Sequence, residues 1–278
     1  MRGFAGKGAF VTGGASGIGF ALGRAFAAEG MKVMLADIEQ AALDKSVAAL
    51  RETGAEVRGL VCDVADRASV ERAAVETVAA FGKVHVLCNN AGIGTGGPME
   101  LISPGDWEWT IGVNLMGVIH GIAAFLPHIK THGEGGHVVN TASMAGMVNA
   151  PLMGPYNATK FAVVSLSETL AAELAGSGIG VSVLCPGWVD TRINESARNR
   201  PSRFGPSPQP LPAARERMAQ VAELLRQGMK PEEVAARVMA AIRDNDLYVF
   251  THAAMRGAVE DRFRRILAAY DKAGRFGA

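Results

Sequence analysis

The chain has almost no net charge and few cysteines. Its 278 residues include 28 lysines and arginines against 27 aspartates and glutamates, a formal net charge of +1. Without a long run of one sign, nucleic acid and anionic membrane surfaces are not expected as partners. The three cysteines are an odd number and do not suit a disulfide framework. Cys62, Cys88 and Cys185 each lie in or at the end of an apolar strand-like run, which predicts reduced, buried thiols in a cytoplasmic protein.

The sequence also lacks internal repeats, linkers and long apolar runs. No apolar run reaches the length of a membrane-spanning helix, so no membrane association is expected. A strand begins within the first ten residues, which leaves no room for a secretory signal peptide. We identify no metal site. One domain over residues 1–278 is therefore predicted.

What the chain does contain is a regular alternation of short apolar strands and helical segments. Strands are predicted from residue 10 and at 31–37, 57–62, 84–88, 137–141, 179–185 and 247–251. Helices are predicted at 17–29, 40–52, 66–81, from 104 to a kink or end at Pro127, at 155–174, and after 251 to about residue 270. Strands such as 84–88 are apolar along their length, as in sheets covered on both faces. The fold class is α/β, a Rossmann-type doubly wound parallel sheet of about seven strands.

The stretch 10–37 combines a strand, a glycine turn, a helix and a second strand that ends in a carboxylate. Gly13, Gly17 and Gly19 allow a tight turn and a close approach to a pyrophosphate. The following helix directs free N–H groups at the phosphates. Asp37, 18 residues after Gly19, can accept hydrogen bonds from a ribose diol. A glycine turn alone can be an empty connection, but the complete context predicts dinucleotide binding.

One segment interrupts the alternation. Residues 194–212 are rich in Arg, Ser and Pro, with five prolines between 201 and 212, so they cannot be strand or helix throughout. The segment follows the carboxyl end of the 179–185 strand, where ligands bind in open parallel sheets. We interpret residues 190–228 as a substrate lid; a flexible surface insertion is the alternative.

Tyr156 and Lys160 lie one turn apart on a predicted helix and share a face. A cation there favours the phenolate and lowers the tyrosine pKa from its ordinary value of about 10. The pair can then serve as a general acid/base near neutral pH. Ser143 follows a strand and can hydrogen-bond a substrate oxygen. Taken alone, a Tyr and a Lys at this spacing are more often a solvent-exposed surface pair, and a Ser after a strand is more often a helix cap or turn residue.

Together the motifs resemble the short-chain dehydrogenase/reductase family over about residues 6–250. The residues that carry the resemblance are 12–19, 89–92, Asn114, Ser143, Tyr156, Lys160 and 186–187. The resemblance implies that Tyr156 is the acid/base, that Ser143 orients the substrate oxygen, and that Lys160 binds the nicotinamide ribose. Asn114 would hold a water that links Lys160 to solvent. The implied cofactor contacts are Gly13, Ser16, Gly17, Ile18, Gly19, Asp37, Asp63, Val64, Asn90, Ala91, Gly92, Tyr156, Lys160, Pro186, Gly187, Val189 and Thr191.

Asp37 favours NAD as the cofactor, because a carboxylate repels the 2′-phosphate of NADP. The family's NADP enzymes usually carry a base just after that strand or inside the glycine turn, whereas Ile38 and Glu39 follow here. Five apolar residues lie where the family's substrate pocket forms, and Met and Trp make an adaptable apolar surface. For any one of them, an ordinary position in the core is an equally good interpretation. These residues are Met144, Met147, Met153, Trp188 and Ile193.

The favoured function is NAD-dependent hydride transfer on a bulky, mainly apolar secondary alcohol or ketone, aryl compounds included. The run 107–114, the triplet 154–156 and the tail 245–248 resemble the Cα-dehydrogenases that oxidise benzylic alcohols in lignin aryl ethers. A 3-oxoacyl thioester reductase and a non-catalytic dinucleotide-binding protein are the alternatives. Family members pair through the helices that carry Asn114 and Tyr156, so the resemblance implies a homotetramer or homodimer.

Overall fold

The computed structural model describes residues 1, 3–206 and 212–274. Its centre is a seven-stranded sheet with the order β3-β2-β1-β4-β5-β6-β7, in which all neighbouring strands are parallel. The strands are β1 (Gly8–Thr12), β2 (Lys32–Asp37), β3 (Val57–Val61), β4 (Val86–Asn89), β5 (Gly136–Thr141), β6 (Ile179–Cys185) and β7 (Tyr248–Phe250). The predicted parallel sheet is confirmed, and β7 is one residue shorter at each end than predicted.

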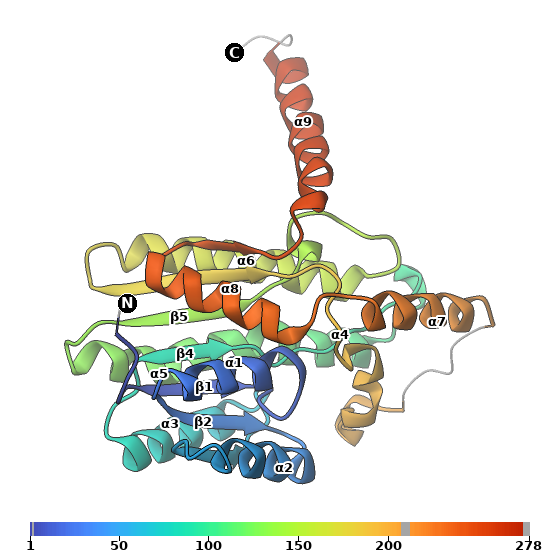
Figure 1. Cartoon of the computed structure of the whole chain (residues 1–278). Coiled ribbons are helices and arrows are strands. Elements are labelled where there is room, and N and C mark those ends of the chain that lie inside the picture. The colour runs from blue at the N-terminus through green and yellow to red at the C-terminus, as the bar shows by residue number, and fades with distance from the viewer. Residues whose placement is uncertain (2, 207–211, 275–278) are drawn as a thin grey trace.

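Helices cover both faces of this sheet (Figure 1). One face carries α1 (Gly17–Ala28), α2 (Gln40–Arg51) and α8 (Pro231–Asp244), and the other carries α3 (Arg67–Phe81), α5 (Gly117–Thr131) and α6 (Gly154–Glu173). Successive residues of β1 alternate between the two cores. Ala9 and Val11 join the first, whereas Phe10 stacks on Phe125 with ring centroids 4.1 Å apart. The sheet is therefore doubly wound, as predicted.

The longest helical stretch differs from its prediction. It consists of α4 (Pro104–Ile111), a π-helical turn η2 (Gly112–Met116) and α5. The expectation that Pro127 could end the helix is wrong, because α5 continues to Thr131. Phe125 and Ile129 flank Pro127 and are fully buried, so their packing outweighs the one helix hydrogen bond that proline removes.

Among the described residues, the stretch Pro104–Thr131 is long and apolar enough to cross a membrane. The expectation that no apolar run reaches such a length is therefore wrong as a statement of length and composition. Core helices of globular proteins meet the same criterion, and α5 packs against α3 in the core.

The segment after β6 contains short helical turns η4 (Ile193–Asn199) and η5 (Ser202–Phe204), followed by α7 (Pro212–Arg226). We call residues 193–204 the strap. Part of the proline-rich stretch, 207–211, lies outside the described residues. The last helix, α9 (Arg256–Ala273), extends away from the sheet (Figure 1), and none of residues 256–273 is buried.

Candidate active site

The strand order reverses at β1, which lies between β2 and β4. Ligands bind at such a switch point, outside the carboxyl ends of the strands. Thr12, the last residue of β1, ties the two sides together. Its Oγ1 accepts hydrogen bonds from the amides of Asn90 (2.9 Å) and Ala91 (3.0 Å), and Asn90 Nδ2 donates to the Thr12 carbonyl at 3.0 Å. The predicted cofactor residues after β4 therefore lie against the glycine turn.

The glycine turn requires its glycines. Gly13 and Gly17 have φ of +64° and +53°, in the left-handed region that favours glycine. A Cβ at Gly19 would lie 2.1 Å from the Gly13 carbonyl oxygen, and a Cβ at Gly17 would lie 3.0 Å from the Thr191 methyl carbon. Within the described chain, the Ser16 side chain makes no capping hydrogen bond to α1. The first amides of α1, including that of Ile18, thus remain for an anion such as a pyrophosphate.

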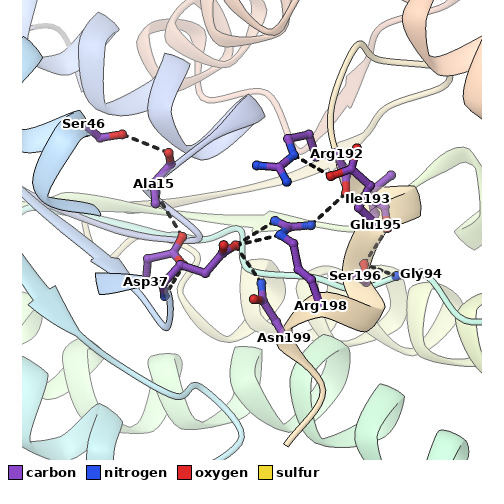
Figure 2. Close-up of polar contacts among 11 residues, drawn as sticks. Ala15, Asp37, Ser46, Gly94, Arg192, Ile193, Glu195, Ser196, Arg198 and Asn199 are labelled. Carbon is purple, nitrogen blue, oxygen red and sulfur yellow. Dashed lines mark hydrogen bonds and ion pairs between the residues drawn. The ribbon is translucent and has the colours of Figure 1, made fainter. Parts of the chain in front are cut away.

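Asp37 forms a corner beside this turn (Figure 2). Its Oδ2 accepts from the Ala15 amide at 3.0 Å, and its Oδ1 accepts from the Glu39 amide at 3.0 Å. Ser46 on α2 donates to the Ala15 carbonyl at 2.9 Å, which braces the turn. Each carboxylate oxygen keeps lone-pair capacity for a further donor, as a ribose diol would supply.

Tyr156 and Lys160 lie on the first turns of α6, and Lys160 Nζ is 5.5 Å from the centre of the Tyr156 ring. The Tyr156 hydroxyl is hydrogen-bonded to Ser143. Ser143 precedes a short turn after β5, where its Oγ accepts from the Ala145 amide at 3.1 Å and donates to the Pro186 carbonyl at 3.5 Å. The structure therefore brings the predicted acid/base, its cation and the predicted orienting hydroxyl together.

Burial dominates the ionisation of this pair. It raises the pKa of Tyr156, while the hydrogen bond from Ser143 acts in the opposite direction. Burial also lowers the pKa of Lys160 to about 8, and Nζ donates to the Thr141 carbonyl at 2.8 Å. The prediction that Lys160 lowers the pKa of Tyr156 is therefore wrong for this arrangement, because burial outweighs the lowering effects.

Asn114 is fully buried in the π-helical turn. Its Oδ1 accepts from the Ile93 amide at 2.8 Å, and its Nδ2 donates to the Ile93 carbonyl at 3.0 Å and to Thr159 Oγ1 at 3.4 Å. A Cβ at Gly92 would lie 3.5 Å from Asn114 Oδ1 and 3.6 Å from Lys160 Nζ, so these three residues converge. The side chain of Asn114 thus holds the loop after β4 in place; its expected role in a water relay stays a prediction.

Residues 7–202 match the short chain dehydrogenase family. The chain belongs to this family. A C alpha-dehydrogenase of Sphingobium sp. strain SYK-6 is 37% identical over 268 residues, which cover 96% of this chain and 87% of the relative. A crystal structure of a short chain dehydrogenase/reductase from Burkholderia phymatum in complex with NAD is 42% identical, with a TM-score of 0.94 over 97% of both chains. The apo form of LigD from Sphingobium is 34% identical, with a TM-score of 0.80 over 95% of this chain and 97% of that one.

The remaining predicted cofactor residues of this short-chain dehydrogenase lie around the same crevice. Pro186 accepts from the Met144 amide at 2.9 Å, and the Gly187 amide donates to Thr251 at 3.1 Å. Val189 is buried and forms an isolated bridge with Met229. On the other side of the site, Val64 is buried, and Asp63 forms an ion pair with Arg203 of the strap at 2.8 Å.

The predicted substrate residues divide into two groups. Met144 is buried and Met147 packs against the same small core cluster, so both have the surroundings of core residues. Met153 is half-buried and bridges to Gly97 in the loop after β4, and Trp188 is 39% exposed. Ile193 begins the strap, where its carbonyl accepts from Ser196 Oγ at 2.5 Å. That these residues line a substrate pocket stays a prediction.

Sequence reasoning missed the arginines that fasten the strap. Arg198 pairs with Glu39, Arg200 with Asp106 and Arg203 with Asp63, at 2.7, 2.5 and 2.8 Å. The arginines were visible in the sequence as part of an Arg-rich loop. Their partners are 94 to 159 residues away, and an irregular segment has no periodicity from which such pairs could be predicted.

One cluster of possible metal ligands occurs in the described part of the chain, at the amino ends of β1 and β4. It consists of His85, His132 and Glu134. His85 Nδ1 accepts from the Gly8 amide at 3.2 Å, and its Nε2 lies 2.9 Å from Glu134. His132 Nε2 lies 2.9 Å from the Val84 carbonyl, and its Nδ1 accepts from the Glu134 amide at 3.1 Å. All four ring nitrogens are thus engaged, and the cluster serves as a structural tie. The three cysteines are buried free thiols.

Proposed function

We propose that this short-chain dehydrogenase oxidises a bulky, mainly apolar secondary alcohol with NAD, or reduces the matching ketone. The observation that carries the proposal is the meeting of Ser143, Tyr156 and Lys160 beside the dinucleotide crevice. A dinucleotide-binding protein without catalysis would not need this set of hydroxyls and a buried ammonium in one place.

The residues present fit NAD. A side chain at Gly13, Gly17 or Gly19 would collide with the turn or its neighbours, so the cradle is left open by glycine. Gly13 and the α1 amides would hold the pyrophosphate, Asp37 and Asn90 the adenosine ribose, Lys160 the nicotinamide ribose, and the backbone at Val189, with Thr191 nearby, the carboxamide. Bound NAD supplies the two-electron acceptor for the alcohol carbon.

The chain's own residues supply orientation and a proton acceptor. The Ser143 hydroxyl donates a hydrogen bond to the substrate oxygen and fixes its position. The Tyr156 hydroxyl, already hydrogen-bonded to Ser143, accepts the alcohol proton as its phenolate and returns it in the reverse reaction. Lys160 holds the cofactor ribose and balances the charge on the phenolate, while Asn114 fixes the loop after β4.

Two points support the choice of an aryl or similarly apolar alcohol. Met153, Trp188 and Ile193 are the apolar residues predicted to line the substrate pocket, and the relative from Sphingobium is named a C alpha-dehydrogenase. A 3-oxoacyl thioester reductase is the second candidate. Asp37 and the near-neutral charge count against it, because such enzymes are normally NADP-linked and dock an acidic carrier. Cytoplasmic location and a homodimer or homotetramer belong to the same proposal.

A screen of secondary alcohols with NAD, read by the absorbance of the reduced cofactor, tests the proposal. Benzylic alcohols should give the highest kcat/KM, short aliphatic alcohols lower values, and 3-hydroxyacyl thioesters lower values still. Turnover of thioesters above all alcohols would favour the second candidate. No reaction with any alcohol or ketone would overturn the function proposed here.

A further inference from the structure

A basic side chain, that of Arg198, lies beside the Asp37 corner, although it is far from Asp37 in the sequence. Arg198 of the strap donates to Glu39 Oε1 from Nε at 3.1 Å and from Nη2 at 2.7 Å, and Asn199 Nδ2 donates to the same oxygen at 2.8 Å. The Glu39 amide in turn donates to Asp37 Oδ1 at 3.0 Å. Figure 2 shows the Arg198 guanidinium on the side of the corner that faces the strap. Glu39 therefore joins the ribose-reading carboxylate to an arginine from a distant part of the chain.

All three guanidinium nitrogens of Arg198 donate hydrogen bonds within the protein. Its third nitrogen, Nη1, donates to the Arg192 carbonyl at 3.2 Å, so every guanidinium nitrogen has an acceptor. The side chains of Arg198 and Glu39 are only 27% and 28% exposed. The Arg198 hydrogen bond holds the pKa of Glu39 below its ordinary value, so the carboxylate stays charged at neutral pH. The guanidinium charge beside the Asp37 corner is therefore paired with a carboxylate.

We propose that Glu39 is a cofactor-selecting residue that acts through Arg198. Asp37 reads the ribose directly, whereas Glu39 keeps the nearby guanidinium engaged, so that the corner offers two carboxylates and a neutralised base. The inference rests on the proposed dinucleotide site and adds a second determinant of NAD selectivity to it. On this proposal, Arg198 is a cation that could bind a 2′-phosphate, and its pairing with Glu39 prevents it from doing so.

Binding titrations of NADH and NADPH, followed by the fluorescence of the reduced cofactor, test this without any substrate. The Glu39→Gln variant removes the charge that neutralises Arg198 and weakens the hydrogen bonds that hold it. It should bind NADPH roughly tenfold more tightly than the unaltered chain, with NADH affinity changed by less than about threefold. The double variant Glu39→Gln with Arg198→Met should lose the gain for NADPH. Glu56→Gln is the matched control, because it removes a carboxylate paired with Lys32 at the opposite end of β2.

The alternative is that the Glu39–Arg198 pair only fastens the strap. The Glu39→Gln variant would then weaken both cofactors together or change neither, and either result overturns the proposal. Retention of the NADPH gain in the double variant overturns it too. Glu39→Ala removes both the charge and the acceptor oxygen, and serves as a second test should the amide variant fold poorly by circular dichroism. If the unaltered chain binds both cofactors equally, this inference and the NAD preference fail, whereas the proposed alcohol oxidation stands. If it binds neither, the proposed function fails with it.

Discussion

At the scale of single residues, the proposed proton transfer depends on one hydroxyl. Tyr156→Phe removes the group that accepts the alcohol proton and leaves the ring in place. We expect kcat for alcohol oxidation to fall by about 10²–10⁴, the usual contribution of a general acid/base. NADH affinity should be unchanged in fluorescence titrations, and circular dichroism should report a normal fold. A variant that keeps more than roughly a tenth of the parent kcat would mean that another group takes the proton.

Lys160 should behave differently from Tyr156, because it has two proposed tasks. Its Nζ lies within reach of both the loop at Gly92 and the Thr141 carbonyl. Lys160→Ala should weaken NADH binding by about tenfold as well as lowering kcat, since hydrogen bonds from a charged group contribute roughly 1.5–3 kcal/mol. Cofactor titration separates the two effects. Unaltered NADH affinity would contradict the proposed contact with the ribose.

At the scale of elements, β5 and β6 are joined by a histidine that must stay neutral. Ser182 Oγ donates to the Asp246 carbonyl at 2.6 Å, so His137 Nε2 donates to Ser182 at 2.8 Å. Burial lowers the pKa of His137 from 6.5 to about 3. A depressed folded-state pKa contributes stability that is complete above the unfolded value and is lost as the pH falls toward the folded value.

Urea unfolding at several pH values should detect this histidine. Below pH 6.5, His137 should reduce the free energy of unfolding by up to about 1.4 kcal/mol per pH unit. His137→Gln, which cannot titrate, should flatten the slope between about pH 6.5 and pH 4.5. Identical slopes for the two proteins would show that groups other than His137 cause the acid sensitivity.

The strap is held most firmly at its pair with α4. Arg200 and Asp106 are 5% and 10% exposed at the side chain, and Arg200 also donates to the Phe204 carbonyl at 2.6 Å. Arg200→Met leaves a buried carboxylate without its cation, so unfolding free energy should fall by about 3–5 kcal/mol. Arg203→Met is the control, because its pair with Asp63 is half-exposed and should contribute about 0–1 kcal/mol.

Thermal unfolding and limited proteolysis within residues 193–206 measure the two strap variants. Only Arg200→Met should lower the unfolding midpoint by several degrees and speed up cleavage of the strap. Equal effects of both substitutions would mean that the two ion pairs stabilise the strap equally, which would contradict the argument from their difference in burial.

At the scale of the whole molecule, we expect a homodimer or homotetramer. Apolar side chains of α9 are open to solvent, with Phe263, Leu267 and Tyr270 exposed to 48%, 61% and 72%. Exposed apolar surface of this kind commonly marks an interface. Light scattering should give a mass of at least twice 29.0 kDa. A single 29.0 kDa species at about micromolar concentration would contradict the expectation.

The sequence predicted the parts of this molecule that local chemistry determines. Gly19 and Asp37 have a fixed spacing, and Tyr156 and Lys160 share a helix face, so the site could be assembled from short-range signals. The persistence of α5 beyond Pro127 could not be predicted, because distant packing of its neighbours decides it. The pairing of Arg198 with Glu39 could not be predicted either, because only folding brings the strap close to the end of β2.

The packing of α8 on α1 has a consequence for synthesis on the ribosome. β1, β2 and β3 can assemble as soon as they emerge, and β4 to β7 then add one by one to a single edge. Within the described chain, α8 makes the most extensive helix contact with α1, and its Ile242 carbonyl accepts a hydrogen bond from the chain's first residue at 2.8 Å. At ordinary translation rates, roughly 10–40 s pass between the synthesis of α1 and that of α8. During this interval the apolar surface of the nascent amino-terminal half is a natural target for chaperones, and a chain interrupted before α8 would remain exposed there.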